Sequence, residues 1–466
     1  MLKYIYLNTV CVILIIILRT VQIPFLNKIK SPHIKKYAAN TGWLFADNFL
    51  KQVINLIVGV FLARYLNPEG LGSISYASTY MQLLNPIAIL GINAIAIKEF
   101  VNNHEKANTI IGTTFYLKLI SSLTAFALLV FCAIFLENLP EMRYYIVIVG
   151  LSYLLYPFQV IDFYFQSNLK SKFTVISQQI ATVIAALLKV LGMIKGYAIE
   201  YFIWIILVEI FVSTASQVII YKLKIKLPKW SFDKALAIKM LKESLPIIFT
   251  GFFIVIYMRV DQLMIQKMLD TKSLGNFTAA IKLSEAFYVV PGIIAGSLFP
   301  AIINGLKISR EEYLNRMQRL YSVFTLLCIV VSLVVVVFGD LIVSILYGEA
   351  YTQTSAVLKV HFCNSIFVFF GVAYSQAFIV EGMQRFTTIN TIVGAIINVL
   401  LNFYFIPKIG IVGSAIATFI AQFYSGFFCL LLFPKTRVHF KLMLNSFNII
   451  KTIRLYSTKI RTLDNE

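Results

Sequence analysis

Charged residues are scarce in this sequence. Asp, Glu, Lys and Arg make up 13% of its 466 residues, whereas hydrophobic residues make up 59% and the mean hydropathy is +0.82. An average soluble domain carries about twice that share of charge, so the composition excludes a soluble globular protein. Apolar runs of membrane length recur from one end of the chain to the other. They predict an all-α polytopic membrane protein.

Signatures of catalysis are missing as well. The sequence has no Walker A loop, no cluster of metal ligands and no nucleophile elbow, which excludes ATP hydrolysis on this chain. Its five cysteines all lie within apolar runs, at positions 11, 132, 328, 363 and 429. An odd number in such places predicts small hydrophobic side chains rather than disulfides or metal ligands. We therefore expect no enzyme, no catalytic residues, no metal and no cofactor.

Acidic residues are about half as frequent as basic ones. The chain has 21 Asp and Glu against 41 Lys and Arg, which gives a net charge of +20. Such an excess can indicate nucleic-acid binding. Here, however, the basic residues lie mainly in short segments between apolar runs, as they do in the cytoplasmic loops of membrane proteins. We expect no nucleic-acid partner.

The apolar runs predict about 12 core transmembrane helices in two six-helix bundles. The first group of spans is expected at residues 43–66, 74–97, 110–135, 144–166, 172–194 and 201–221. The second is expected at residues 246–268, 277–303, 320–338, 357–381, 387–405 and 409–433. Lys and Arg collect in alternate connections, whereas the NPEG turn at 67–70 has neither. By the positive-inside rule, both ends of the core lie in the cytoplasm.

The segments outside the spans are basic. Residues 1–36 form an apolar and basic leader, in which residues 1–26 are an extra span, an interfacial anchor or an uncleaved signal-like segment. Residues 37–221 and 243–434 are the N-terminal and C-terminal six-helix bundles. Between them, residues 222–242 form a basic interfacial linker with a helix capped by Ser231, although an ordinary loop explains the charge equally well. Residues 435–466 are a basic cytoplasmic tail on the anionic inner leaflet.

An internal repeat relates the two groups of spans. Residues 63–77, ARYLNPEGLGSISYA, align without gaps on residues 266–280, QKMLDTKSLGNFTAA, and the alignment pairs Gly72 with Gly275. Both stretches lie at the first-to-second connection of their group. Because each group has an even number of spans, the two halves share one orientation, and a cavity is expected between them.

Four stretches carry a family resemblance. They read NTGWLFADNFLKQ (40–52), ARYLNPEGLGSISYA (63–77), GINAIAIKE (91–99) and RVDQLMIQKMLDTKSLGNFTAAIKLSE (259–285). The chain resembles the polysaccharide (O-antigen or capsule) repeat-unit flippases, Wzx-type, of the multidrug/oligosaccharidyl-lipid/polysaccharide exporter superfamily. The resemblance implies two bundles around a central cavity and alternating access. It also implies a lipid-linked oligosaccharide of the undecaprenyl-diphosphate type as cargo.

Charges within the first span fit such a cargo. Asp47, Lys51 and Asn55 are spaced by four residues and share one helical face, with the acid before the base as a favourable pair requires. Charges inside a span usually face a protein interior or a water-filled cavity, so we expect Lys51 to line the cavity. The alternative is a lysine that reaches back to the headgroups, which is the better interpretation of Lys118 in the third span.

A second set of charges lies on the seventh and eighth spans. Their signs allow Arg259 to pair with Glu285, or Asp261 with Lys282. Guanidinium and ammonium groups suit a diphosphate or an acidic sugar. The same four side chains could instead only pair with one another and hold the helices together, or form a gate.

Other polar residues stand alone in the spans. Asp162 near Gln166, Lys189 and Glu381 are predicted as isolated ionisable groups, with Lys189 in the lumen. Asp162 and Asp261 are the candidates for coupling to a proton gradient, with sodium as the other candidate ion. His361 is interpreted as a core histidine. The eleventh span carries a polar stripe that consists of Asn390, Asn398 and Asn402. We expect these side chains to form hydrogen bonds with sugars or with a neighbouring helix.

We therefore expect a multi-pass protein of the cell inner membrane that flips a repeat unit to the outer leaflet for surface polysaccharide or lipopolysaccharide biosynthesis. The expected partners are the lipid-linked oligosaccharide, membrane lipids and the polysaccharide polymerase machinery. An ion-coupled multidrug antiporter of the same superfamily is the nearer alternative, and it should show a net acidic cavity. A membrane polysaccharide polymerase is the other alternative, but it should carry a large outward loop.

Overall fold

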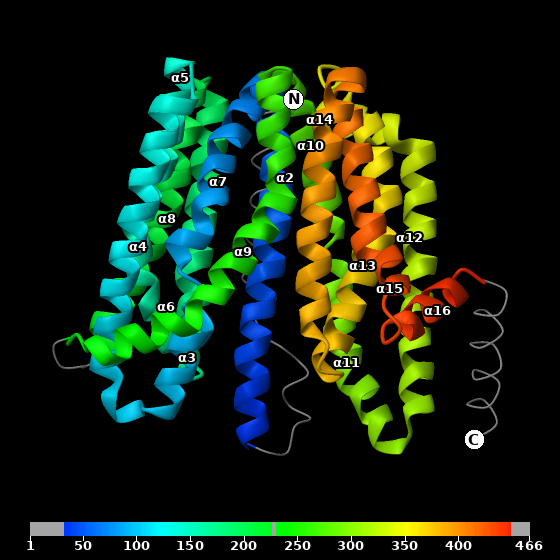
Figure 1. The fold of residues 1–466 in the computed structure, drawn as a ribbon. Helices are drawn as coiled ribbons and strands as arrows, with labels where there is room; N and C mark the ends of the chain where they lie inside the picture. Colours follow the sequence, from blue (N-terminus) through cyan, green and yellow to red (C-terminus); the bar gives the residue numbers. More distant parts are fainter. Residues whose placement is uncertain (1–31, 226–229, 449–466) are drawn as a thin grey trace. The chain divides into compact units, whose positions relative to one another are not determined.

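The computed structural model describes residues 32–225 and 230–448 (Figure 1). These residues form helices joined by short turns, and no strand occurs among them, which confirms the prediction of an all-α membrane protein. Helices satisfy their backbone hydrogen bonds within one segment, as the interior of a bilayer requires. Most of the predicted leader, residues 1–31, and the last part of the predicted tail lie outside the described residues.

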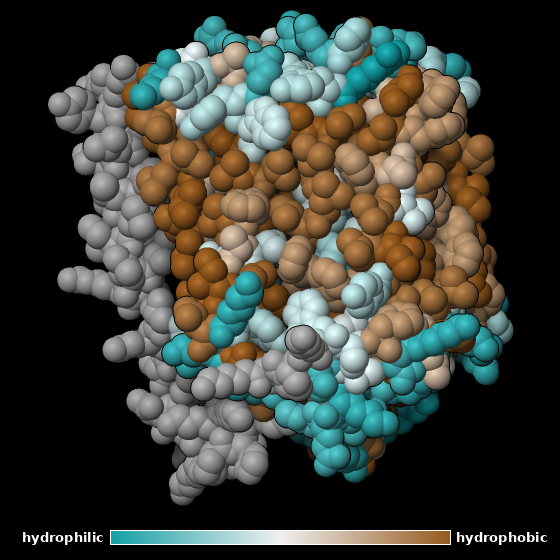
Figure 2. Space-filling view, turned by 90° about the vertical axis from the view of Figure 1, so that its left-hand side faces the viewer, coloured by the Kyte–Doolittle hydropathy of each residue, from teal (hydrophilic) through white to brown (hydrophobic). Residues whose placement is uncertain are grey.

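Within residues 32–225 and 230–448, ten helical segments are long and apolar enough to cross a membrane. Two of them, Phe49–Asn102 and Gln384–Leu432, are 54 and 49 residues long, more than twice the length that one crossing needs. The first is interrupted at Asn67 and the second at Ile409 and Gly410, where the backbone leaves the helical region. Each therefore holds two spans, so the described chain accommodates the twelve predicted ones. The face shown in Figure 2 carries a broad belt of hydrophobic side chains between hydrophilic ends.

Contacts divide the chain into two compact units. The first consists of Met1–Leu66 and Ser73–Val255, and the second of Asn67–Gly72 and Ile256–Glu466. The division falls inside a helix, α9 (Lys234–Met268). The segment boundaries predicted from the sequence stay a prediction.

The first unit is built from α2 (Pro32–Ile89) and the helices that follow it, up to the first part of α9. These helices are α3 (Asn93–Asn102), α4 (Ala107–Leu136), α5 (Pro140–Gly150), α6 (Val160–Ser167), α7 (Lys172–Lys195) and α8 (Ile199–Lys224). A 3₁₀ segment, Leu151–Gln159, joins α5 to α6. It contains Pro157, which cannot donate a helical hydrogen bond.

The start of α9 differs from the prediction. Ser231 does not cap the helix, because its amide donates to Asn108 O at 3.2 Å and its hydroxyl bonds Thr109 at 2.9 Å. Asp233 caps it instead, accepting from the Leu236 amide at 2.9 Å. In the first turns of α9, Ala237 and Met240 pack into an apolar cluster of the first unit. The basic stretch before the seventh predicted span therefore has a buried apolar side.

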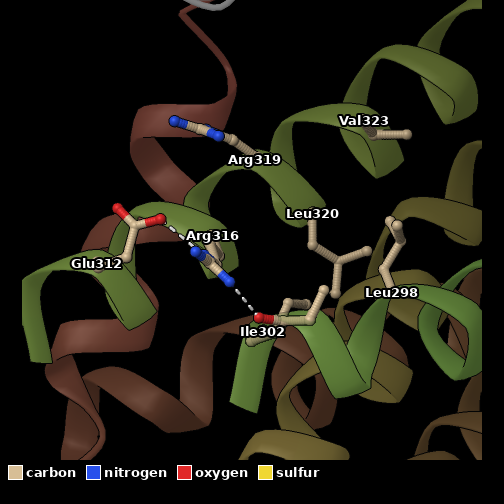
Figure 3. A pocket seen from close by; sticks show the side chains of 8 residues that line it. Leu298, Ile302, Glu312, Arg316, Arg319, Leu320 and Val323 are labelled. Carbon is tan, nitrogen blue, oxygen red and sulfur yellow. Dashed lines mark hydrogen bonds and ion pairs between the residues drawn. The ribbon is translucent and has the colours of Figure 1, made fainter. Parts of the chain in front are cut away.

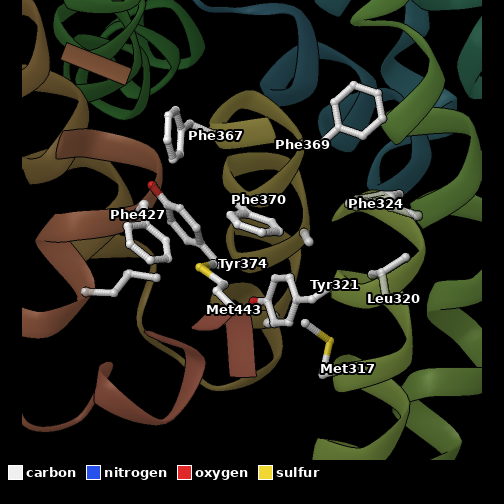
Figure 4. Close-up of a cluster of buried hydrophobic side chains, with 14 of the residues drawn as sticks. Met317, Leu320, Tyr321, Phe324, Phe367, Phe369, Phe370, Tyr374, Phe427 and Met443 are labelled. Atoms are coloured by element: carbon white, nitrogen blue, oxygen red, sulfur yellow. The ribbon is translucent and has the colours of Figure 1, made fainter. Parts of the chain in front are cut away.

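The second unit contains the rest of α9 and the helices that follow it. These are α10 (Thr271–Phe287), α11 (Val290–Ile308), α12 (Arg310–Tyr347), α13 (Thr354–Val380), α14 (Gln384–Phe423), α15 (Cys429–Leu432) and α16 (Arg437–Ser446). Its core is rich in aromatic side chains from α12, α13 and the π-helical segment Tyr424–Phe428 that follows α14. Figure 4 shows Met443 of α16 beside Tyr321 and Tyr374 of this core. The helix in the basic tail is therefore packed on the bundle.

Two glycines of the internal repeat make close helix contacts within the second unit. A Cβ atom on Gly72 would overlap the carbonyl oxygen of Thr271, and a Cβ atom on Gly275 would overlap that of Pro68. In the repeat alignment, Pro68 corresponds to Thr271 and Gly72 to Gly275. The contact is thus self-complementary, and it requires glycine on both sides because only glycine allows backbones so near each other.

Candidate functional site

The first span brings its predicted ion pair to α7. Lys51 Nζ lies 4.0 Å from Asp47 Oδ2 and donates to Gln178 Oε1 at 2.8 Å. The Gln179 amide nitrogen donates to Asp47 Oδ1 at 2.6 Å. Asp47 is buried, whereas 30% of the Lys51 side chain is exposed. Asn55, one turn further along, is exposed. The predicted polar face therefore exists, and it is anchored by two glutamines that the sequence analysis did not single out.

Asp162 is not isolated. Its carboxylate accepts from the Thr174 hydroxyl at 2.6 Å and from the Gln166 amide at 2.9 Å. It also lies within electrostatic range of Asp47 and Lys51. These contacts join α6 and α7 to the charged face of α2. Asp162 thus belongs to the same polar cluster as the first-span pair.

The position of the Lys118 side chain contradicts the prediction that it reaches the headgroups. Its side chain is fully buried, and its ammonium donates to Gln159 Oε1 at 3.0 Å and lies 5.3 Å from the centre of the Phe163 ring. It also interacts electrostatically with Asp162. The protein itself supplies partners at this depth, so the lysine has no need to extend toward water.

Together these side chains form what we call the first-unit network. It contains two acidic and two basic side chains on three helices of the first unit, so their formal charges cancel. They are surrounded by neutral hydrogen-bonding groups from the neighbouring turns. Charged members of the network are Asp47, Lys51, Lys118 and Asp162. Buried intramembrane charges are expected to be paired in this way, and they mark pathways for polar cargo or protons.

The remaining predicted site residue of the first unit, Lys189, is also paired. Its ammonium lies 3.6 Å from Glu209 Oε2 of α8, and both side chains are largely buried. Glu209 also accepts from the Thr182 hydroxyl at 3.3 Å. The prediction that Lys189 is isolated was wrong because its partner comes from the next span. The acid in that span, flanked by apolar residues, was the signal that could have found it.

In the second unit, the structure contains one of the two predicted pairings. Arg259 NH1 of α9 lies 2.9 Å from Glu285 Oε1 of α10, with 19% and 29% of the two side chains exposed. Asp261 is buried, and its Oδ1 accepts a hydrogen bond from the backbone N–H of Gln262 at 2.8 Å. Lys282 lies half-buried on α10, one turn before Glu285. The pairing of Asp261 with Lys282 stays a prediction.

Glu381, predicted as isolated, is the centre of another polar cluster. It accepts from the Tyr313 hydroxyl at 2.9 Å and contacts His439 Nε2 at 3.0 Å, while His439 Nδ1 contacts the Tyr321 hydroxyl at 3.0 Å. Burial raises the pKa of the Glu381 carboxyl. This effect of burial is outweighed by the hydrogen bond with His439, by the charge of His439 and by the hydrogen bond from Tyr313. The pKa of Glu381 therefore lies below its ordinary value.

Two of the uncharged candidates, Asn398 and Asn402, have hydrogen-bond partners within α14. The Asn398 amide donates to Thr418 at 3.1 Å, and the Asn402 amide donates to Asn398 at 3.0 Å. These two members of the predicted stripe therefore hold the two parts of α14 together. His361 is buried with its ring 5.8 Å from that of Phe277, as expected for a core histidine.

Solved structures similar to this chain include a flippase and multidrug transporters. A structure titled "Lipid II flippase MurJ, inward closed conformation" has a TM-score of 0.68 at 18% identity, covering 89% of this chain and 92% of the other. A multidrug resistance MATE family transporter of the MOP superfamily, inward-facing, has a TM-score of 0.64 at 14% identity over 85% and 96%. A MOP superfamily transporter from Pyrococcus furiosus has 0.54 at 13% over 87% and 93%.

At these identities the likeness establishes the fold. No curated protein matches the sequence. A family profile does match, over residues 37–306, and its description is "Polysaccharide biosynthesis protein". That match spans more than half of the chain, including the first-unit network and the Arg259–Glu285 pair. The chain belongs to the polysaccharide biosynthesis protein family.

Proposed function

We propose that this protein flips a lipid-diphosphate-linked oligosaccharide repeat unit from the cytoplasmic to the outer leaflet of the inner membrane, as a Wzx-type flippase. The family, the fold and the intramembrane charges support this proposal. The structure titled as a lipid II flippase has the same fold, and its named cargo is a lipid. We propose alternating access as the mechanism, with a polysaccharide polymerase as the downstream partner.

The observation that carries the proposal is the set of cations held inside the spans by carboxylates. Arg259 forms an ion pair with Glu285. Lys51 forms an ion pair with Asp47 and also donates a hydrogen bond to Gln178. A paired cation is stable without cargo, and a diphosphate can replace the carboxylate as its partner. Arginine suits that exchange because its guanidinium binds phosphate oxygens bidentately, as it binds a carboxylate.

The polar glycan would travel along these groups while the lipid tail stays in the bilayer. The charges of the first-unit network balance, which differs from the net acidic site expected for a cation-drug exporter. Protons or sodium ions are the proposed source of energy, and Asp162 and Asp261 are the proposed proton carriers. Asp261 is buried and Asp162 is partly buried, and protonation removes the cost of a buried charge.

The decisive experiment is the sidedness of the lipid-linked oligosaccharide in cells that lack the protein. A membrane-impermeant glycan probe is applied to intact spheroplasts and to inverted vesicles. Intermediates trapped on the cytoplasmic face support translocation as the missing step. Single repeat units on the outer face would indicate a polymerase, and unchanged intermediates with altered drug sensitivity would indicate a multidrug exporter.

Variants connect the activity to the site. Cells that carry Arg259→Ala should accumulate intermediates on the cytoplasmic face, as the deletion does. Arg385→Ala is the matched control, because Arg385 is an exposed arginine in the first turn of α14 and outside the proposed site. It should restore full activity. Equal membrane levels and equal melting temperatures of the two variants show that folding is not the cause.

A further inference from the structure

A groove between α11 and α12 is lined by none of the charged residues of the candidate site (Figure 3). Its volume is about 330 Å³. Near the α11–α12 turn the two helices are close, because Gly305 of α11 has no side chain and a Cβ atom there would lie 3.1 Å from Arg316 Cδ. The groove begins beside this contact.

The groove is charged at one end and apolar at the other. Figure 3 shows Glu312, Arg316 and Arg319 gathered at one end, with Leu298 and Val323 at the other. On α12 these residues follow the spacing of a single helix face. From Glu312 to Val323 the helix rises by about 16 Å, at about 1.5 Å per residue. Arg310 begins α12 after a predicted cytoplasmic connection, so the charged end faces the inner leaflet surface and the apolar end lies deeper.

The charged end has an excess of positive charge. Arg316 Nε lies 2.6 Å from Glu312 Oε1, and its NH1 donates to the Ala301 carbonyl, so this guanidinium is fixed in place. Arg319 is three residues further on the same face and half-buried. Among the described residues it has no ion-pair partner. Two guanidinium groups and one carboxylate leave one positive charge at the mouth of the groove.

We propose that this groove binds an anionic phospholipid of the inner leaflet. Arg319 and Arg316 contact the phosphate, and one acyl chain lies along Leu298, Ile302 and Val323. The charge matches a phosphate ester, the apolar end matches a hydrocarbon chain, and the order of the two along α12 matches the depth of each part of a lipid in the leaflet. The site is separate from the proposed cargo site and holds a resident lipid that remains between transport cycles.

Native mass spectrometry of the purified full-length protein tests the proposal. The protein in a neutral detergent is titrated with dioleoyl phosphatidylglycerol or dioleoyl phosphatidylcholine, and the number of retained lipids is counted. We expect one phosphatidylglycerol retained about tenfold more tightly than phosphatidylcholine, as one additional charge-assisted hydrogen bond predicts. Arg319→Gln should weaken this binding about tenfold, and Arg319→Lys should restore part of it.

Leu298→Trp blocks the apolar end and leaves both arginines in place. Leu298 is 42% exposed, so the larger side chain does not disturb a packed core. This variant should also lose the retained lipid. Arg385→Gln removes the same charge at an exposed position and should bind phosphatidylglycerol like the wild type. Melting temperatures measured without added lipid confirm that each variant is folded.

Three results would overturn the proposal. Equal weakening by Arg385→Gln would mean that lipid is held by overall charge. Displacement of the retained lipid by inorganic phosphate would mean an anion site without a lipid chain. Displacement by an equal concentration of polyprenyl diphosphate, with loss of binding in Arg259→Ala, would mean that the groove is part of the cargo site.

Discussion

Replacing Lys118 with methionine should destabilise the first unit, because Lys118 is a fully buried base of the first-unit network. Methionine keeps nearly the same length but removes the charge, the hydrogen bond to Gln159 and the contact with Phe163. A desolvated cation–π contact contributes about 2 kcal/mol and a charge-assisted hydrogen bond about 1.5–3 kcal/mol. Hydrogen bonds inside membranes average only about 0.6 kcal/mol in double-mutant cycles. We therefore expect a net loss of about 2 kcal/mol.

A double-mutant cycle tests the reasoning about charge. Asp162→Asn removes the acid with which Lys118 interacts, so the double variant Lys118→Met with Asp162→Asn should lose less stability than the sum of the two single variants. The expected coupling is about 1 kcal/mol, measured by equilibrium unfolding of the purified protein in detergent with increasing denaturant.

Lys195→Met is the matched control, because Lys195 is exposed at the end of α7. It should change the free energy of unfolding by less than about 0.5 kcal/mol. If Lys118→Met proves as stable as this control, or if the cycle shows no coupling, the network does not stabilise the first unit.

Three further predictions concern the second unit. Glu285→Gln should impair flipping less than Arg259→Ala in the sidedness assay, because the glutamine leaves the phosphate-binding guanidinium in place; the reverse order would show that the carboxylate carries the function. Gly275→Ala should cost more than about 1 kcal/mol, since its methyl group overlaps the backbone of Pro68; wild-type stability in denaturant would contradict the close contact. Because the folded-state pKa of Glu381 is depressed, its contribution to holding α16 is complete above the ordinary carboxyl value of 4.5 and is lost as the pH falls through the lower folded value. Hydrogen exchange of α16 should therefore rise at acidic pH in the wild type, and the same pH response in Glu381→Gln would refute this assignment.

The spans could be predicted from the sequence because their signal is local. An apolar run of membrane length needs no knowledge of its neighbours, and the NPEG stretch predicted the break that the backbone makes at Asn67. The capping of α9 was harder to predict. Ser231 and Asp233 are both suitable caps by type, and the choice depends on α4, whose Asn108 and Thr109 bind Ser231 instead.

Partners within the candidate site could not be predicted from the sequence. The i,i+4 pair of Asp47 and Lys51 is local and was found, whereas Gln178 lies 127 residues from its partner Lys51. The prediction for Lys118 was wrong because it used only the depth of the residue in its span. Depth gives the distance of a lysine from the headgroups, but it does not identify the side chains of other helices beside it. A snorkelling lysine and a buried one have the same local sequence.

The paired glycines of the repeat have a consequence for how this chain can change. Gly72 contacts Thr271 while Gly275 contacts Pro68, the counterpart of Thr271. Two identical subunits make contacts of this kind across a two-fold axis, where one codon determines both sides of the interface. In a fused, duplicated chain the two sides are encoded separately. The residues that the two glycines face can therefore differ, as Pro68 and Thr271 do, while both glycines are kept, a freedom that a homodimer does not have.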